Sequence, residues 1–366
     1  MMGQLVVSNL FHRPIRTLIG VMAIAVEVAL VILIVGLTSG ILQESAKRIE
    51  GVGADIMVQA RAAQMLITFS GSPMPIKIAD KIAELKYVQA VAPVLLQFNS
   101  TGGVETVWGI DANSFRDVSS GFVFLQGTDF QRPDDILIDD WQAKAKHVKV
   151  GDSYTLFNHN WTVVGIVEHG KGSRLFVPIT TLQDLVGARD KASIFLVKCT
   201  HPDHTEDVIG EIKELLPENP VRPLKDFMTL MTSTNIPGLQ TFINAMIALA
   251  VSIGLLVIFL TMYTTVLERT RDIGVLKSLG ASKLMIVRAL LEETTLLCLL
   301  GIAAGVGLSY LVRAGFLALF PTLSILITPE WILRAALIAL LGAVFGASYP
   351  AWVASRRDPV EALTYD

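Results

Sequence analysis

Long apolar blocks alternate with more polar segments along this chain. The blocks occupy residues 17–42, 242–267, 294–320 and 331–354. A helix needs roughly 20 apolar residues to cross about 30 Å of hydrocarbon, and each block reaches that length. The pattern therefore predicts four membrane-spanning helices. The first block is longer than the apolar region of a cleaved signal peptide, about 7–15 residues, so we expect a retained helix.

The segment between the first two predicted spans, residues 43–238, has the alternation of short strand-like and helix-like stretches that is typical of a folded α+β domain. Alternating or β-branched runs predict strands there, and apolar residues at helical spacing predict two helices. The predicted strands are residues 54–59, 91–98, 104–110, 162–167 and 194–197, and the predicted helices are residues 75–88 and 205–216. About 200 residues suffice for an independent core, in one lobe or two.

A helical stalk is predicted where the first span ends. Residues 39–50 continue its helical pattern until Gly51 and Gly53, residues that favour a helix end. Residues 225–233 are the candidate for a matching stalk on the return path.

Composition narrows the class of protein. Of the 366 residues, 52% are hydrophobic and only 17% are charged, against about 25% charged in soluble domains. This balance excludes intrinsic disorder, which requires few apolar and many charged residues. The net charge of −3 provides no basic excess for nucleic acid. An integral membrane protein with a large water-facing part remains.

Positive charges predict the orientation of the spans. Lys and Arg residues precede the first span, follow the fourth, and cluster between the second and third. By the positive-inside rule, residues 1–16, the loop 268–293 and the tail 355–366 are cytoplasmic. Residues 43–238 then lie outside. The expected fold is an α-helical membrane protein with four transmembrane helices and an α+β extracytoplasmic domain inserted between helices 1 and 2.

Residue patterns of nucleotide, metal or catalytic chemistry are weak in this sequence. Residues 165–173 approach the phosphate-binding pattern G-x-x-x-x-G-K-[ST], but Gly172 stands where the Mg²⁺-binding hydroxyl is required, so we interpret the segment as a turn. His201 and His204 lack a third ligand, whereas structural zinc normally takes four. No nucleophile triad stands out, although triads need not be contiguous in sequence. We expect no catalytic residue and no metal site.

The loop between the second and third predicted spans is the most informative segment. Ile273, Leu276 and Leu279 recur at helical spacing, Gly280 suits a helix end, and Ser282 suits the N-cap of the next helix. Two interpretations stay open on these residues alone. One is a rigid surface helix that transmits force or docks a partner; the other is an interfacial loop that obeys the charge rule.

The same loop carries a family resemblance. Residues 268–282 read E-R-T-R-D-I-G-V-L-K-S-L-G-A-S and resemble the E-R-x-x-E-I-G-x-x-x-A-x-G-A-x signature of the FtsX/MacB-like permeases of ABC transporters, the mechanotransmission (type VII) class. Residues 350–363 resemble the closing P-A-x-x-A-x-x-x-x-P-x-x-A-L of that family. Asn9, Arg13, Arg16 and Thr17 are similar to its N-terminal pattern.

The resemblance implies a permease dimer, with a second copy of this chain or a related one, in the bacterial cytoplasmic (inner) membrane. Each subunit would rest on a separate ABC ATPase subunit, which binds the ATP and Mg²⁺, so that this chain holds no cofactor. In that family the loop forms a coupling helix seated on the ATPase dimer. Carried over by position, the contact residues are Glu268, Arg269, Asp272, Gly274, Lys277 and Gly280. Asp272 stands where the family usually has Glu, and Ser278 where it has Ala.

The function implied by the resemblance is export or extraction of a hydrophobic or amphipathic substrate, driven by ATP hydrolysis in the partner and by motion of the extracytoplasmic domain. The alternative is an FtsX-like mechanotransmitter that regulates an extracytoplasmic enzyme or signalling partner. Haem export is a third, weaker option. A periplasmic adaptor or outer-membrane protein is a further candidate partner, and the lipid bilayer surrounds the spans.

Glu27 is the polar exception in the first span. It lies about 16 Å along the helix from Arg16, at about 1.5 Å per residue, and therefore near the middle of the bilayer. An ionised carboxylate there costs several kcal/mol without a partner, and such residues are functional candidates. One hypothesis is a polar contact to a substrate, a proton or another span. The other is a protonated side chain hydrogen-bonded to Ser252 or Thr261.

Overall fold

The computed structural model describes two compact units. The described residues are 14–61, 73–99, 105–226, 232, 234–236 and 238–356. The helical unit comprises Met1–Thr38, Gly238–Ala318 and Ile325–Asp366, and the α/β unit comprises Ser39–Pro237 and Leu319–Ser324. Much of the N-terminal segment and nearly all of the C-terminal tail predicted as cytoplasmic, and most of the predicted return stalk, lie outside the described residues.

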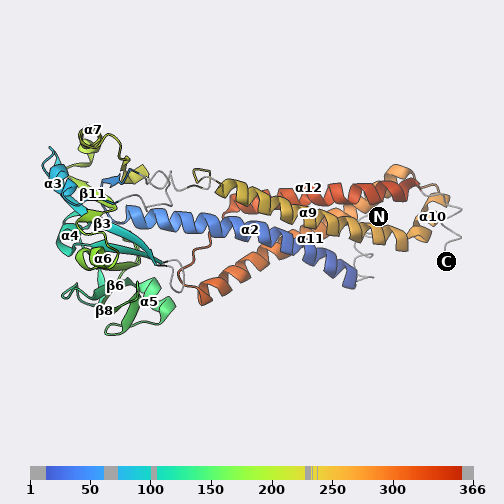
Figure 1. The fold of residues 1–366 in the computed structure, drawn as a ribbon. Coiled ribbons are helices and arrows are strands. Elements are labelled where there is room, and N and C mark those ends of the chain that lie inside the picture. The colour runs from blue at the N-terminus through green and yellow to red at the C-terminus, as the bar shows by residue number, and fades with distance from the viewer. Residues whose placement is uncertain are drawn as a thin grey trace. The chain divides into compact units, whose positions relative to one another are not determined.

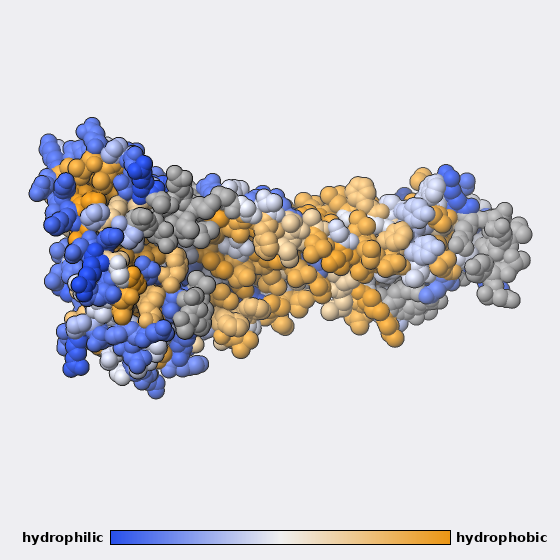
Figure 2. Space-filling view, viewed as in Figure 1, coloured by the Kyte–Doolittle hydropathy of each residue, from blue (hydrophilic) through white to orange (hydrophobic). Residues whose placement is uncertain are grey.

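Four long helices dominate the helical unit (Figure 1). They are α2 (Pro14–Glu50), α9 (Leu239–Glu268), α11 (Lys283–Leu319) and α12 (Pro329–Arg356). Within the described residues, these four are long and apolar enough to cross a membrane. Figure 2 shows hydrophobic residues gathered over their visible surface, as expected for helices that face lipid. The prediction of four spans with an α/β domain inserted after the first is confirmed.

Small residues allow these helices to approach closely. A Cβ at Gly301 or Gly305 of α11 would come within 3 Å of Ile24 or Ala25 of α2. In α12, the small side chains of Ala339, Ala343 and Ala347 are buried in the hydrophobic core of the helical unit, which also contains Ile24 of α2. Because lipid supplies little hydrophobic drive between helices, close packing of this kind stabilises the bundle.

Helix α2 runs unbroken through the predicted stalk and ends at Glu50. The amide of Gly51 donates to the carbonyl oxygen of Lys47, at 2.8 Å. A side chain at Gly51 would collide with the carbonyl of Gly170. The close approach of these two backbones therefore requires glycine.

Ten described strands form one sheet in the α/β unit, in the order β12-β1-β11-β3-β4-β9-β6-β8-β5, with β7 paired to β8. The β4–β9 and β6–β8 pairs are parallel and the others antiparallel. The strands are β1 (Ile56–Gln59), β3 (Val88–Asn99), β4 (Glu105–Ile110), β5 (Phe124–Gly127), β6 (Asp135–Asp139), β7 (Ser153–Leu156), β8 (His159–Val167), β9 (Leu175–Pro178), β11 (Ile194–Cys199) and β12 (Val221–Pro223). A separate pair joins β2 (Met74–Pro75) to β10 (Lys191–Ala192). The domain is thus built on one continuous sheet.

Short helices accompany this sheet. They are α3 (Ile78–Ala83), α4 (Ala112–Ser119), α5 (Asp140–Lys146), α6 (Ile179–Leu185) and α7 (Thr205–Leu215), with 3-10 turns η1 (Pro202–His204) and η2 (Leu224–Asp226). The helix predicted for residues 75–88 was too long, because Pro75 belongs to β2 and Val88 already begins β3. The helix predicted for residues 205–216 is confirmed as α7.

The segment that approaches a phosphate-binding loop is a turn, as predicted. Gly170 and Gly172 have φ values of +110° and +68°, a region that favours glycine. Strand β9 follows at Leu175, not the helix that a phosphate-binding loop requires. A side chain at Gly172 would collide with the buried ring of Trp108. The glycine therefore serves the packing of the α/β core.

Candidate functional site

A short helix, α10 (Thr270–Ser278), connects α9 and α11. Gly280 follows it with a φ of +95°. Next along the chain, the Oγ of Ser282 accepts the Met285 amide, at 3.2 Å, at the start of α11. The predicted helix, its glycine end and the serine cap are all present.

The inner side of α10 is fixed to the helical unit. Ile273 and Gly274 are buried, and the Thr270 hydroxyl donates to the Leu267 carbonyl at 2.8 Å. Just before the helix, Arg269 Nη1 lies 3.1 Å from Glu293 Oε2 of α11. The two side chains of this ion pair are only 16% and 9% exposed. Buried contacts of this kind hold the short helix in one orientation.

The outer side of α10 and the first turn of α11 expose apolar side chains. Leu279 is 79% exposed and Leu284 is 78% exposed. We call this surface the α10 patch; its members are Val275, Leu276, Leu279, Leu284 and Met285. Single exposed apolar residues are ordinary, but a cluster marks a surface that contacts a partner or a membrane.

The six residues predicted to contact the ATPase do not share one environment. Glu268 and Gly280 are exposed, Lys277 is half-buried, and Gly274 is buried. Arg269 is engaged by Glu293 inside the helical unit, and the side chain of Asp272 lies outside the described residues. Of the three apolar residues at helical spacing, Ile273 is buried like Gly274, whereas Leu276 and Leu279 are exposed. The signature residues therefore divide into an inward group that holds the helix and an outward group that is accessible.

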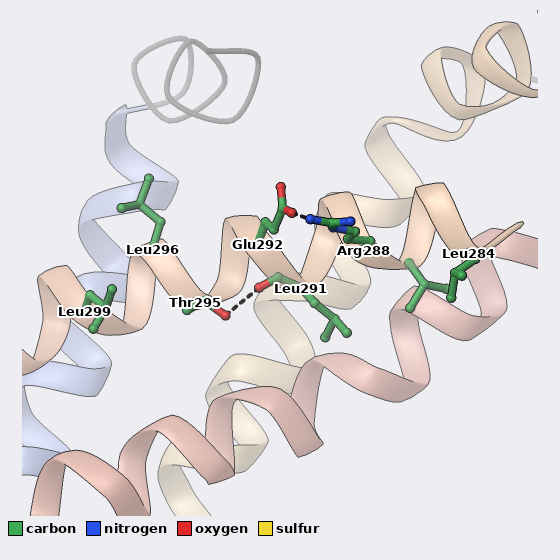
Figure 3. A pocket seen from close by; sticks show the side chains of 8 residues that line it. Leu284, Arg288, Leu291, Glu292, Thr295, Leu296 and Leu299 are labelled. Carbon is green, nitrogen blue, oxygen red and sulfur yellow. Dashed lines mark hydrogen bonds and ion pairs between the residues drawn. The ribbon is translucent and has the colours of Figure 1, made fainter. Parts of the chain in front are cut away.

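A groove of about 590 Å³ lies along α11, close to the α10 patch (Figure 3). Its lining residues come from one face of that helix: Leu284, Val287, Arg288, Leu291, Glu292, Thr295, Leu296 and Leu299. Arg288 Nε and Glu292 Oε1 form an ion pair across one turn, at 2.9 Å. The spacing of Leu284, Leu291 and Leu299 along a helix gives the signal that a sequence analysis could have used.

Glu27 is buried in the helical unit, with 5% of its surface exposed. Its Oε2 atom has no hydrogen-bond partner among the described residues. The carboxyl group occupies the space next to Gly254 of α9, where any side chain would collide with it. The hydroxyls of Ser252 and Thr261 donate instead to carbonyls of their own helix, at 2.7 and 2.8 Å. Neither predicted partner binds Glu27.

The fold and this site define a class: a four-span membrane permease with a large α/β domain after the first span and a fixed interfacial helix between the second and third. Two family profiles match the chain. Residues 17–215 match the MacB-like periplasmic core domain, which covers more than half of the sequence, and residues 244–359 match the FtsX-like permease C-terminal. The chain therefore belongs to the FtsX/MacB-like family of ABC transporter permeases, as its signature residues indicated.

Curated relatives give the same assignment. The macrolide export ATP-binding/permease protein MacB of Campylobacter fetus subsp. fetus (strain 82-40) is 28% identical over 389 residues, covering 96% of this chain and 59% of that protein. The MacB of Escherichia coli is 27% identical over 393 residues, covering 96% and 58%. This chain thus spans a little under three fifths of these relatives. The periplasmic region of MacB from Actinobacillus actinomycetemcomitans aligns with a TM-score of 0.40 and 15% identity, over 50% of this chain and 96% of that one.

Proposed function

We propose that this permease couples ATP hydrolysis by a separate ABC ATPase subunit to motion of its α/β unit, and thereby exports or extracts a hydrophobic or amphipathic substrate. The observation that carries the proposal is the α10 patch on a helix whose inner side is fixed. Burying one exposed leucine contributes about 1.5–3 kcal/mol. Leu276 and Leu279 therefore supply apolar surface whose burial against a partner stabilises the complex.

A fixed helix is suited to transmit force. The Arg269–Glu293 pair and the buried Ile273 tie α10 to the bundle, so a push on the patch moves α11 and α9 together. Helix α2 then continues from the helical unit into the α/β unit without a break, over 37 residues. Because a continuous helix resists compression, a displacement of its membrane part is passed along the chain to the domain that follows.

The exposed apolar surface of the long helices indicates two further partners, lipid and a second copy of the chain. Helices α9, α11 and α12 are less buried than α2, so apolar surface, including the α11 groove, is left for lipid and for a second copy of the chain. We place the chain in a bacterial inner membrane with both termini and α10 in the cytoplasm and the α/β unit outside. ATP and Mg²⁺ bind to the ATPase, and the Oε2 atom of Glu27, which has no partner among the described residues, is available for a polar contact to a substrate or a proton.

Reconstitution tests this function. The chain and its ABC ATPase are placed in proteoliposomes, and ATP hydrolysis is measured across a panel of amphiphiles, with transport followed in parallel. Leu279→Ser should lower both the affinity of the complex and its substrate-stimulated hydrolysis. The matched control is Leu125→Ser, which removes a 53% exposed leucine from β5, the last strand at one end of the sheet. Equal effects of the two variants would contradict the proposal, and ATP-driven motion without transport would favour the mechanotransmitter.

A further inference from the structure

The α/β unit contains a polar cavity that the proposed function does not use. Its volume is about 240 Å³, which is room for several water molecules. The walls come from the end of α2, from β4, α5 and β9, and from Thr322, Leu323 and Ser324 of the α11–α12 loop, which belong to this unit. Arg48 and Arg174 line it together with the apolar Ile41, Leu175 and Leu323. The cavity thus combines two cations with hydrocarbon.

Both arginines have hydrogen-bonding capacity left over. Arg174 donates from Nη2 to the Thr322 carbonyl at 2.8 Å, but its buried Nη1 has no partner among the described residues. Arg48 donates weakly from Nη2 to Ser45 Oγ at 3.4 Å, and its buried Nε has no hydrogen-bond partner among those residues. The two guanidinium groups lie close enough to repel each other. Buried donors without acceptors cost free energy, which an added acceptor recovers.

The neighbouring carboxylates leave this capacity unfilled. Glu44 approaches Arg48 Nε only to 3.8 Å. Glu105 is bound by Lys146 at 2.9 Å and by Gln142 at 2.9 Å. Asp139 accepts the Gln142 amide through Oδ1 at 2.6 Å, and its buried Oδ2 has no partner among the described residues. Among the described residues, Glu44 at 3.8 Å is the carboxylate that pairs with Arg48, and none pairs with Arg174, so both guanidinium groups can accept an oxyanion from outside.

We infer that this cavity binds an oxyanion, a phosphate group free or on an amphiphile, through the guanidinium groups of Arg48 and Arg174. A guanidinium offers parallel N–H donors that match phosphate oxygens. Ile41, Leu175 and Leu323 lie beside these donors and can contact a short hydrocarbon attached to the phosphate. This is an equilibrium binding site that needs neither ATP nor a partner chain, and it therefore goes beyond the proposed function.

Titration calorimetry on the full chain in a neutral maltoside detergent tests the site. The probes are inorganic phosphate, hexyl phosphate and, as an uncharged control, hexanol. We expect saturable binding of hexyl phosphate and none of hexanol. Hexyl phosphate binding about ten times more tightly than inorganic phosphate identifies an amphiphile site, and equal affinities identify a free-anion site. No saturable binding of either phosphate would overturn the inference.

Substitutions locate the binding. Arg48→Gln and Arg174→Gln should each weaken phosphate binding about tenfold or more, because each removes charge-assisted donors. The matched control is Arg189→Gln, which removes an 80% exposed arginine from the same unit. Melting temperatures establish whether each variant is folded. If Arg174→Gln does not fold, Arg48→Gln alone tests the site. Unchanged affinity in a folded arginine variant, or equal loss in Arg189→Gln, would refute the site.

Discussion

Removing Arg269 should destabilise the helical unit, because it takes the Arg269 guanidinium away from the buried carboxylate of Glu293. The two side chains are 16% and 9% exposed, and Arg269 Nη1 lies 3.1 and 3.4 Å from the two carboxylate oxygens. Breaking a buried ion pair by removing one partner costs about 3–5 kcal/mol, whereas replacing both partners by apolar residues is often neutral. Arg269→Met should therefore cost about 3 kcal/mol, and Arg269→Met with Glu293→Leu less than about 1 kcal/mol.

Unfolding in mixtures of dodecyl sulfate and maltoside measures these free energies for the four members of the double-mutant cycle. A cost of Arg269→Met below about 1 kcal/mol, with additive effects, would show that the pair behaves as an exposed one and would refute the reasoning. The cycle also distinguishes two roles of Arg269. If it only fixes α10, the stable double variant keeps ATPase coupling. If it contacts the ATPase directly, the double variant is stable and uncoupled.

Three further predictions follow from single residues. Gly172→Ala should destabilise the α/β unit by about 2–4 kcal/mol, from a collision with Trp108 and a φ of +68°, measured by thermal melting. Glu27→Gln should leave the fold intact and reduce transport; unchanged transport would remove Glu27 from the mechanism. Burial raises the pKa of Asp139 to about 6. As the pH falls, the folded state therefore binds a proton at a higher pH than the unfolded state does, and the free energy of unfolding rises by about 1 kcal/mol between pH 7 and pH 5. Asp139→Asn keeps the acceptor for the Gln142 amide and should remove that rise; a rise that persists would assign it to another group.

Local patterns accounted for much of this fold. Apolar length predicted the four spans, because a helix in lipid must satisfy its own backbone and stay apolar over the whole bilayer. Gly280 and Ser282 marked the boundaries of α10 and α11 through capping. The short helices α4 and α5 were missed, although Asp111 and Asp139 cap them, since helices of seven or eight residues show little periodicity.

The environments of individual site residues could not be predicted from the sequence. The signature identified Arg269 but not its partner, because Glu293 lies 24 positions away on another helix. The cavity of Arg48 and Arg174 brings together residues up to 283 positions apart, from Ile41 to Ser324. Such sites depend on tertiary packing, and no periodicity or local motif records them.

Disulfide crosslinking between α10 and the ATPase tests the central claim most directly. Both native cysteines, Cys199 and Cys298, are buried, so a cysteine introduced at Leu279 is the accessible one among the described residues. With single cysteines placed across the ATPase surface, Leu279→Cys should form a crosslink in membranes whose extent changes when ATP is bound. Leu125→Cys should form none. A crosslink from Leu125→Cys and none from Leu279→Cys would contradict the account.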